Sequence, residues 1–210
     1  MIRILIADDH AVVRQGLKQI IADAHDIDVA GEASKGNEAL NQALKNDYDV
    51  AVIDITMPDR SGLDILKELK TRKPNLKVLI LSMHPEEQYA VRSLRAGASG
   101  YLTKDSTPDE LISAIRKIAL GRKYVSSSLA EKLASQLGTN AERPLQDALS
   151  DRECEVMGMI ASGKRLTEIA AELCLSVKTI GTYRSRILRK MNMKNNAELT
   201  CYSLEKQFMD

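Results

Sequence analysis

The chain has 210 residues, of which 44% are hydrophobic and 28% charged. This length allows one large domain or two modest ones, and the composition excludes a largely disordered protein. Thirty basic side chains against 29 acidic ones leave a net charge of +1, so any affinity for nucleic acid has to come from a local patch. No apolar run approaches the ~18 residues of a membrane helix, and the amino terminus carries no cleavable signal pattern. The three cysteines are too scattered for a disulfide framework or a zinc site, so we expect a cytoplasmic protein without membrane contact.

The first 120 residues alternate short β-branched runs with longer segments of helical periodicity. Strict alternation at this spacing predicts a doubly wound α/β fold, a flavodoxin-like parallel sheet of five strands in the order 2-1-3-4-5 with helices on both faces. The predicted strands are Ile2–Ala7, Asp28–Ala33, Val50–Ile53, Lys77–Leu81 and Ser99–Leu102. The predicted helices are Val12–Ala24, Gly36–Asn46, Gly62–Arg72, Glu86–Ala96 and Pro108–Leu120.

Beyond Gly121 the strand pattern disappears. We expect residues 121–145 to form a linker that includes a short helix over Val125–Leu137. Turn-forming residues follow that helix, as is typical of a linker. Residues 146–210 show helical patterns only, which predicts a small all-α domain. Its first helix begins with a capping box at Ser150 and ends before Gly163. The other predicted helices are Leu166–Leu173, Val177–Met191 and Asn196–Lys206.

Polar side chains follow four of the predicted strands. Asp8 and Asp9 follow the first strand, and Asp54 follows the third. Functional sites in such sheets lie beyond the carboxyl ends of the strands, so these carboxylates should converge there and bind a cation such as Mg²⁺. Ser82 ends the fourth strand and Lys104 follows the fifth, which places a hydroxyl and a cation beside a carboxylate that can accept a phosphoryl group. Each residue alone is most simply a solvated turn residue; the complete set in chain order indicates a site.

Three stretches resemble the receiver domain of two-component response regulators, across about residues 1–120. They are Ile4–His10, Val52–Gly62 and Gly97–Lys104, and together they contain all the motifs of that domain. The resemblance implies the same doubly wound fold and a phosphoryl-accepting function.

The resemblance also implies a role for each polar residue at the strand ends. Asp54 would be the phosphoacceptor, charged by the phosphohistidine of a sensor histidine kinase. Lys104 would pair with a phosphoryl oxygen, while Ser82 and Tyr101 would form a switch pair in which Ser82 bonds the phosphate and Tyr101 turns inward. Mg²⁺ would be the cofactor, and its ligands, direct or through water, would be Asp8, Asp9, Asp54 and the backbone carbonyl of Thr56.

Some positions depart from the pattern common in receivers. Asp105 follows the lysine where many receivers have proline, and Met83 is larger than the residue often found after the switch serine, so it restricts access to the phosphoryl group. Thr56 and His84 lie where side chains are expected to tune hydrolysis of the phosphate. We expect His10 to begin a helix and His25 to lie on the surface.

A basic segment lies near the carboxyl end, where residues 176–194 contain six basic and no acidic side chains. Apolar side chains recur along one face of the predicted helix Val177–Met191, and the opposite face is polar. A face of Lys, Arg, Thr and Ser suits the major groove of DNA. Arg184 lies nearer the apolar side, so we expect it to pair with a carboxylate such as Glu153 instead of reading DNA. The candidate DNA contacts are Lys178, Thr179, Gly181, Thr182, Ser185, Arg186 and Arg189.

The helix before this one, Leu166–Leu173, is joined to it through Cys174–Ser176, a turn of helix-turn-helix length. The segment from Leu149 to Met191 resembles the LuxR-type four-helix DNA-binding domain, and the whole chain resembles response regulators of the NarL/FixJ class. The resemblance implies a transcription regulator that binds promoter DNA, dimerises when phosphorylated on Asp54, and has RNA polymerase as a further candidate partner. We expect the three cysteines to pack as small hydrophobes within these helices.

Two other functions stay open. The run from Asp54 to Thr56 is loosely similar to Mg²⁺-dependent phosphatases that form an aspartyl-phosphate, but those enzymes use a second acid where Thr56 stands and need a substrate cap. The favoured function, a transcription regulator, involves no substrate turnover: a phosphoryl group is transferred to Asp54 and is later removed by self-dephosphorylation. In the remaining alternative the receiver serves only for dimerisation and does not respond to phosphate. The departures at Met83 and Asp105 allow this alternative, whereas the complete set of acidic residues at the strand ends opposes it.

Overall fold

The computed structural model describes residues 1–83, 86–126, 129–131 and 148–205. The chain divides into two compact units, Met1–Ser135 and Gln136–Asp210. Most of the expected linker lies outside the described residues, as do His84 and Lys206. Of the short helix expected over Val125–Leu137, residues 125–126 and 129–131 are described; the latter three are helical and the former two are not. Within the described ranges, no helix is long and apolar enough to cross a membrane.

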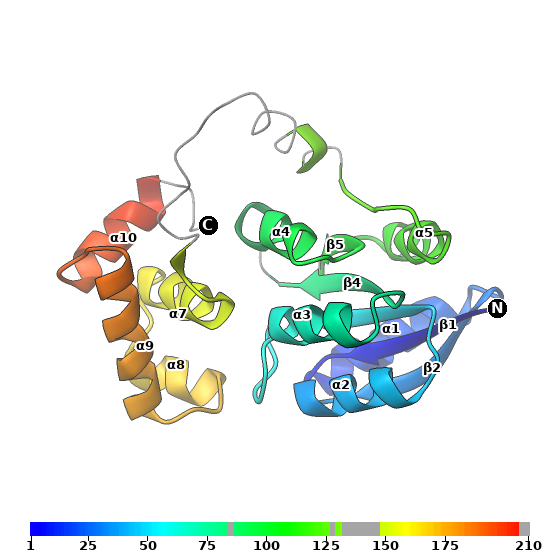
Figure 1. Cartoon of the computed structure of the whole chain (residues 1–210), viewed down its shortest axis with the longest axis horizontal. Helices are drawn as coiled ribbons and strands as arrows, with labels where there is room; N and C mark the ends of the chain where they lie inside the picture. The colour runs from blue at the N-terminus through cyan, green and yellow to red at the C-terminus, as the bar shows by residue number, and fades with distance from the viewer. Residues whose placement is uncertain (84–85, 127–128, 132–147, 206–210) are drawn as a thin grey trace. The chain divides into compact units, whose positions relative to one another are not determined.

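The first unit is built on a parallel sheet of five strands in the order β2-β1-β3-β4-β5, which confirms the predicted topology (Figure 1). The central strand β3 is buried along its whole length, and its last residue, Asp54, pairs with Leu81 of the next strand. Burial on both faces explains why β3 and β4 are apolar without alternation. The strands are β1 Ile2–Ala7, β2 Ile27–Ala33, β3 Val50–Asp54, β4 Lys77–Ser82 and β5 Gly100–Thr103.

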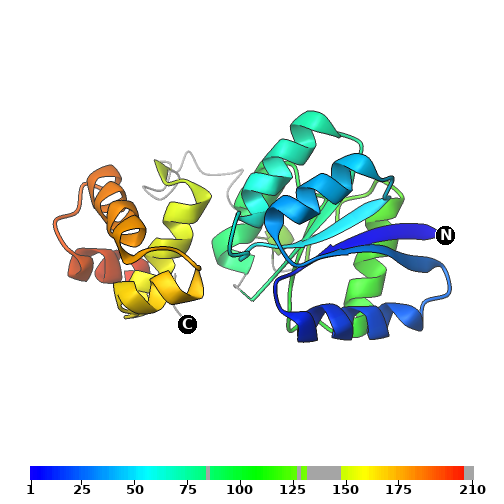
Figure 2. The same ribbon diagram turned by 90° about the horizontal axis from the view of Figure 1, so that it is seen from below.

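Helices cover both faces of this sheet. Successive strand residues point to opposite sides, so Leu5 belongs to a core that includes side chains of α2, α3 and α4, whereas Ile6 belongs to a core that includes side chains of α1 and α5. Figure 2 shows α1 and α5 on one side of the sheet and α2 and α3 on the other. The helices are α1 Ala11–Ala22, α2 Gly36–Lys45, α3 Gly62–Arg72, α4 Glu86–Arg95 and α5 Pro108–Ala119.

The described part of the second unit, residues 148–205, holds four helices around one apolar core (Figure 1). The predicted capping box is present, because the Ser150 side chain accepts from the Glu153 N–H and the Glu153 carboxylate accepts from the Ser150 N–H. Gly163 ends the first helix at a φ of 85°, in the left-handed conformation that favours glycine, as predicted. The helices are α7 Asp151–Ala161, α8 Leu166–Glu172, α9 Val177–Lys190 and α10 Asn196–Glu205.

The prediction that all three cysteines pack as small hydrophobes is wrong for two of them. Cys154 is buried in the core of the second unit, but Cys174 and Cys201 are exposed. Cys174 does not lie in a helix: it ends α8 at a φ of 49°, and the Leu175 N–H donates to the Ala170 carbonyl around it. Cys174 thus lies at a left-handed turn after the helix and not on its buried face, which accounts for its exposure.

Candidate functional site

The polar residues at the strand ends of the first unit meet in one place. The Lys104 Nζ lies 2.6 Å from Asp8 Oδ2 and 2.8 Å from Asp54 Oδ2. Asp8 is 1% exposed and Asp54 3%, so both carboxylates are held out of water against this one ammonium group. Ligand atoms of Asp8, Asp9, His10 and Asp54 all lie within 4.8 Å of one another. The convergence expected from the sequence is therefore present in the fold.

Local backbone contacts hold the two buried carboxylates in position. The Asp8 side chain accepts from the His10 N–H at 2.8 Å, and its backbone carbonyl accepts from Arg14 Nη1 at 2.8 Å. Asp54 Oδ1 accepts from the Thr56 N–H at 3.3 Å. At Gly62 an added Cβ would lie 2.1 Å from the Asp54 carbonyl oxygen, so only glycine lets α3 begin this close to the end of β3.

The charges at this site do not balance. Burial raises the pKa of Asp54 to about 6, although Lys104 opposes the rise. Burial lowers the pKa of Lys104, but its contacts with Asp54 and Asp8 outweigh this and leave the pKa above its ordinary value. Three carboxylates against one ammonium group leave an excess of negative charge, and oxygen donors of this kind are what Mg²⁺ prefers. The residues present fit a divalent cation.

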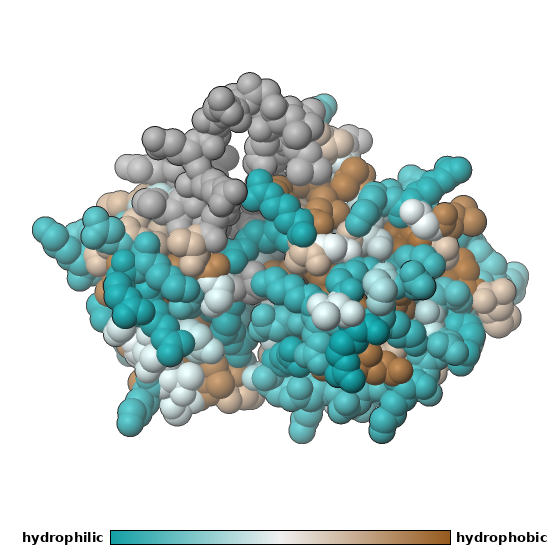
Figure 3. Space-filling model, viewed as in Figure 1, coloured by the Kyte–Doolittle hydropathy of each residue, from teal (hydrophilic) through white to brown (hydrophobic). Residues whose placement is uncertain are grey.

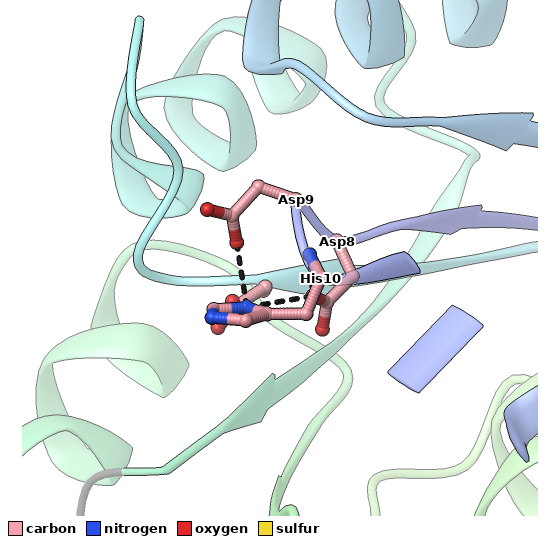
Figure 4. A group of neighbouring side chains, drawn as sticks. Asp8, Asp9 and His10 are labelled. Carbon is pink, nitrogen blue, oxygen red and sulfur yellow. Dashed lines mark hydrogen bonds and ion pairs between the residues drawn. The ribbon is translucent and has the colours of Figure 1, made fainter. Parts of the chain in front are cut away.

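His10 lies closer to the carboxylates than the sequence indicated. It is the N-cap residue of α1, which confirms the expectation that it begins a helix. Its Nδ1 is also 2.9 Å from Asp9 Oδ1 and 3.3 Å from Asp8 Oδ1, with the ring turned toward both side chains (Figure 4). The only sequence signal for this contact is that His10 directly follows the acidic pair.

The residues expected to form the switch lie on neighbouring strands. Ser82 ends β4 and Tyr101 lies within β5, and both are fully buried, so the Tyr101 ring is turned inward in this structure. Met83, which we expected to restrict access to the site, is 75% exposed, and Asp105 is also exposed. His25 lies on the surface as predicted.

The polar face expected for DNA contact is found on α9. Ile180 and Ile187 are buried in the core of the second unit, whereas Val177, expected on the apolar face, is 46% exposed at the first turn. The surface over α9 is hydrophilic in the view of Figure 3. Thr179 and Gly181 are half-buried. The exposed candidates are Lys178, Thr182, Ser185, Arg186 and Arg189.

The prediction that Arg184 pairs with a carboxylate such as Glu153 is wrong. The Arg184 Nε donates to the Asn196 Oδ1 of α10 at 2.6 Å. Glu153 is instead paired with Lys190, whose Nζ lies 2.5 Å from Glu153 Oε2. Burial would raise the pKa of Glu153, but Lys190 and the Ser150 N–H lower it below its ordinary value. Lys190 is therefore paired within the unit.

Two family models match the chain. The model described as "Response regulator receiver domain" matches residues 4–116, and the model described as "Bacterial regulatory proteins, luxR family" matches residues 147–203. Response regulator UvrY of Escherichia coli K12 is 37% identical over 201 residues, covering 95% of this chain and 92% of that protein. Response regulator GacA of Pseudomonas protegens is 36% identical over 211 residues, covering 100% of this chain and 99% of that protein.

Solved structures agree with both halves. RcsB from Salmonella enterica serovar Typhimurium, bound to promoter rprA in the presence of the phosphomimetic BeF3⁻, matches with a TM-score of 0.66 and 26% identity, covering 96% of this chain and 97% of that one. A structure of two RcsB dimers bound to two parallel DNAs matches with a TM-score of 0.60 and 27% identity, covering 98% of each chain. The signal receiver domain of NarL from Mycobacterium tuberculosis matches with a TM-score of 0.56 and 32% identity, covering 58% of this chain and 98% of that one.

Proposed function

Since the chain belongs to the two-component response regulators that join a receiver domain to a LuxR-type DNA-binding domain, we propose that Asp54 is its phosphoacceptor. The family consists of transcription regulators and not of classical enzymes, and a sensor kinase typically phosphorylates its receiver. The single observation that carries the proposal is the buried Asp54 carboxylate, which lies 2.8 Å from Lys104 at the carboxyl end of the central strand.

The proposed reaction is a phosphoryl transfer from a histidine of a sensor kinase to Asp54. An Asp54 carboxylate oxygen attacks phosphorus in line, the phosphorus–nitrogen bond breaks, and the histidine ring leaves with its electron pair. Lys104 lies beside the acceptor and pairs with a phosphoryl oxygen as the transfer proceeds. Bound Mg²⁺ would neutralise charge on the phosphoryl oxygens, held by Asp8, Asp9, Asp54 and the Thr56 carbonyl.

The phosphoryl group then acts through the switch pair. Phosphate at Asp54 adds charge and acceptor oxygens that hold Ser82 toward the site, with Tyr101 inward behind it. This biases the receiver toward a state that releases the DNA-binding domain and favours homodimers. The state ends when phospho-Asp54 is hydrolysed within the protein, with no other substrate turned over.

In the second unit we infer that α9 is the helix that enters the major groove of promoter DNA. Its exposed polar face and its position after a helix-turn-helix turn support this. Gly181 allows close approach of the backbone to DNA. The candidates for base contacts are Lys178, Thr182 and Ser185, and those for phosphate contacts are Thr179, Arg186 and Arg189.

The proposed domain boundaries are those expected from the sequence: a receiver over residues 1–120, a linker over 121–145 and the DNA-binding domain over 146–210. The relatives solved with promoter DNA and as DNA-bound dimers support promoter DNA and a second copy of the chain as partners. RNA polymerase is a further proposed partner, and the proposed place of action is the cytoplasm, where a promoter-binding regulator meets its DNA.

The proposal is tested by treating the full chain and its Asp54→Asn variant with acetyl phosphate, with and without Mg²⁺. We expect an acid-labile adduct of one phosphoryl group on Asp54 of the wild type only, and only with Mg²⁺, by mass spectrometry. Footprinting should then show stronger promoter protection after phosphorylation. Phosphate on another residue would overturn the assignment, and DNA binding that ignores the phosphodonor would favour the receiver as a dimerisation module alone.

A further inference from the structure

One side chain outside the cluster of carboxylates ties the loop after Asp54 to a neighbouring helix. Asp59 lies in that loop, between β3 and α3. Its Oδ1 accepts from the Gly36 N–H at 2.6 Å, and its Oδ2 accepts from the Asn37 N–H at 2.9 Å. These N–H groups belong to the first turn of α2, where the chain's own N-cap residue, Lys35, makes no side-chain capping bond. Asp59 therefore caps α2 from 22 and 23 residues away.

The carboxylate binds these groups as an anion. Partial burial would raise the pKa of Asp59, but the N–H groups of Asn37 and Gly36 lower it below its ordinary value. Packing reinforces the contact, because a Cβ added at Gly36 would lie 2.8 Å from the Arg60 carbonyl oxygen. The loop and the start of α2 thus touch through backbone as well as through this side chain.

The same loop is closed at its base. The Gly62 N–H donates to the Ile55 carbonyl at 2.8 Å, so the two ends of the loop are joined. Inside it, Met57 is fully buried and Pro58 fixes one backbone torsion. With the base closed and the middle buried, two contacts fix the outer part of the loop: Asp59 ties it to α2, and the ion pair of Arg60 Nη2 with Glu68 Oε2, at 2.6 Å, ties it to α3.

We propose that Asp59 is a positioning residue, which holds the loop in place and with it the backbone carbonyl that Thr56 would offer to the cation. This inference rests on the proposed function, because it assumes that Mg²⁺ binds beside Asp54. Residues that orient metal ligands without touching the metal typically change its affinity by about tenfold or more. Asp59 acts here on a backbone ligand three positions before it.

The test separates positioning from helix capping by using the full chain and three variants. Asp59→Ala removes both the tie and the cap. Asp59→Ala combined with Lys35→Ser restores a local cap on α2, because Lys35 already has the extended backbone of an N-cap residue. Lys73→Met is the matched control: its Nζ ties α3 to the opposite end of α2 through the Ala43 and Asn46 carbonyls. Mg²⁺ affinity is measured by calorimetric titration, and thermal stability by scanning calorimetry.

We expect Asp59→Ala to weaken Mg²⁺ binding by about tenfold and to lower the Tm of the first unit by roughly 4 °C. The double variant should regain the Tm but not the Mg²⁺ affinity, and Lys73→Met should lower the Tm while Mg²⁺ affinity stays unchanged. Unaltered Mg²⁺ affinity in Asp59→Ala, or affinity restored together with the Tm in the double variant, would overturn the positioning role of Asp59 and leave the proposed function standing. A wild type that binds no Mg²⁺ would overturn the proposed function as well.

Discussion

Replacing Asp54 by asparagine should stabilise the protein in the absence of Mg²⁺. Asp54 is 3% exposed, and burial raises its pKa from the ordinary 3.8 to about 6. At 1.36 kcal/mol per pKa unit, holding this carboxylate charged costs the folded state about 3 kcal/mol at neutral pH. The asparagine side chain has nearly the same shape, carries no charge and can still accept a hydrogen bond from Lys104, so most of this cost disappears.

The pH dependence gives the sign of the effect. Because the folded-state pKa of Asp54 lies above the ordinary value, the folded protein binds this proton more tightly than the unfolded chain does. The wild type therefore loses stability as the pH rises from about 4 to about 6, and the full cost is present above that window. The advantage of Asp54→Asn should be largest near pH 7.5 and should vanish near pH 4.

Scanning calorimetry of the full chain in EDTA measures this difference, with the transition of the second unit as an internal reference. An increase of up to about 3 kcal/mol corresponds to a Tm increase of roughly 10 °C for a domain of this size. Asp28→Asn, which removes an exposed carboxylate from strand β2 of the same sheet, should change stability by less than about 0.5 kcal/mol. Equal or lower Tm for Asp54→Asn at pH 7.5, or an advantage that persists at pH 4, would refute the reasoning.

Three further outcomes are expected in the second unit. Cys174→Gly should raise its stability by about 0.5 kcal/mol, because Cys174 is exposed and held at a φ of 49° that favours glycine; an unchanged or lower Tm would contradict this. Glu153→Gln should lower its stability by about 2 kcal/mol at neutral pH, because Lys190 loses a buried partner, and the loss should shrink as Glu153 of the wild type becomes protonated in acid. In DNA-binding titrations, Arg189→Ala should weaken binding to all DNA sequences alike and should lower the salt dependence of the affinity by the equivalent of about one phosphate contact. Lys178→Ala should instead lower the binding free energy by about 1–3 kcal/mol at particular base pairs only. An unchanged sequence preference in Lys178→Ala would mean that another side of α9 faces the bases.

Much of the fold and of the site could be predicted from the sequence because the signals are local. The capping box at Ser150 and the terminal Gly163 mark helix ends through contacts within a few residues, and the structure confirms both. The convergence of Asp8, Asp54 and Lys104 was also predictable, because the carboxyl ends of parallel strands meet at one edge of a sheet. Strand order and strand ends together are enough to bring these side chains into one place.

Only the tertiary structure decided which distant side chains touch. Whether Arg184 or Lys190 reaches Glu153 depends on how α9 is rotated and placed against α7, and a helical pattern gives the apolar face without that placement. Asp59 in the sequence is an ordinary loop carboxylate; it caps α2 because two connections of the sheet pack together, a contact that no local pattern records. Periodicity determines what faces the core, whereas the partners of polar side chains are set by the packing of whole elements.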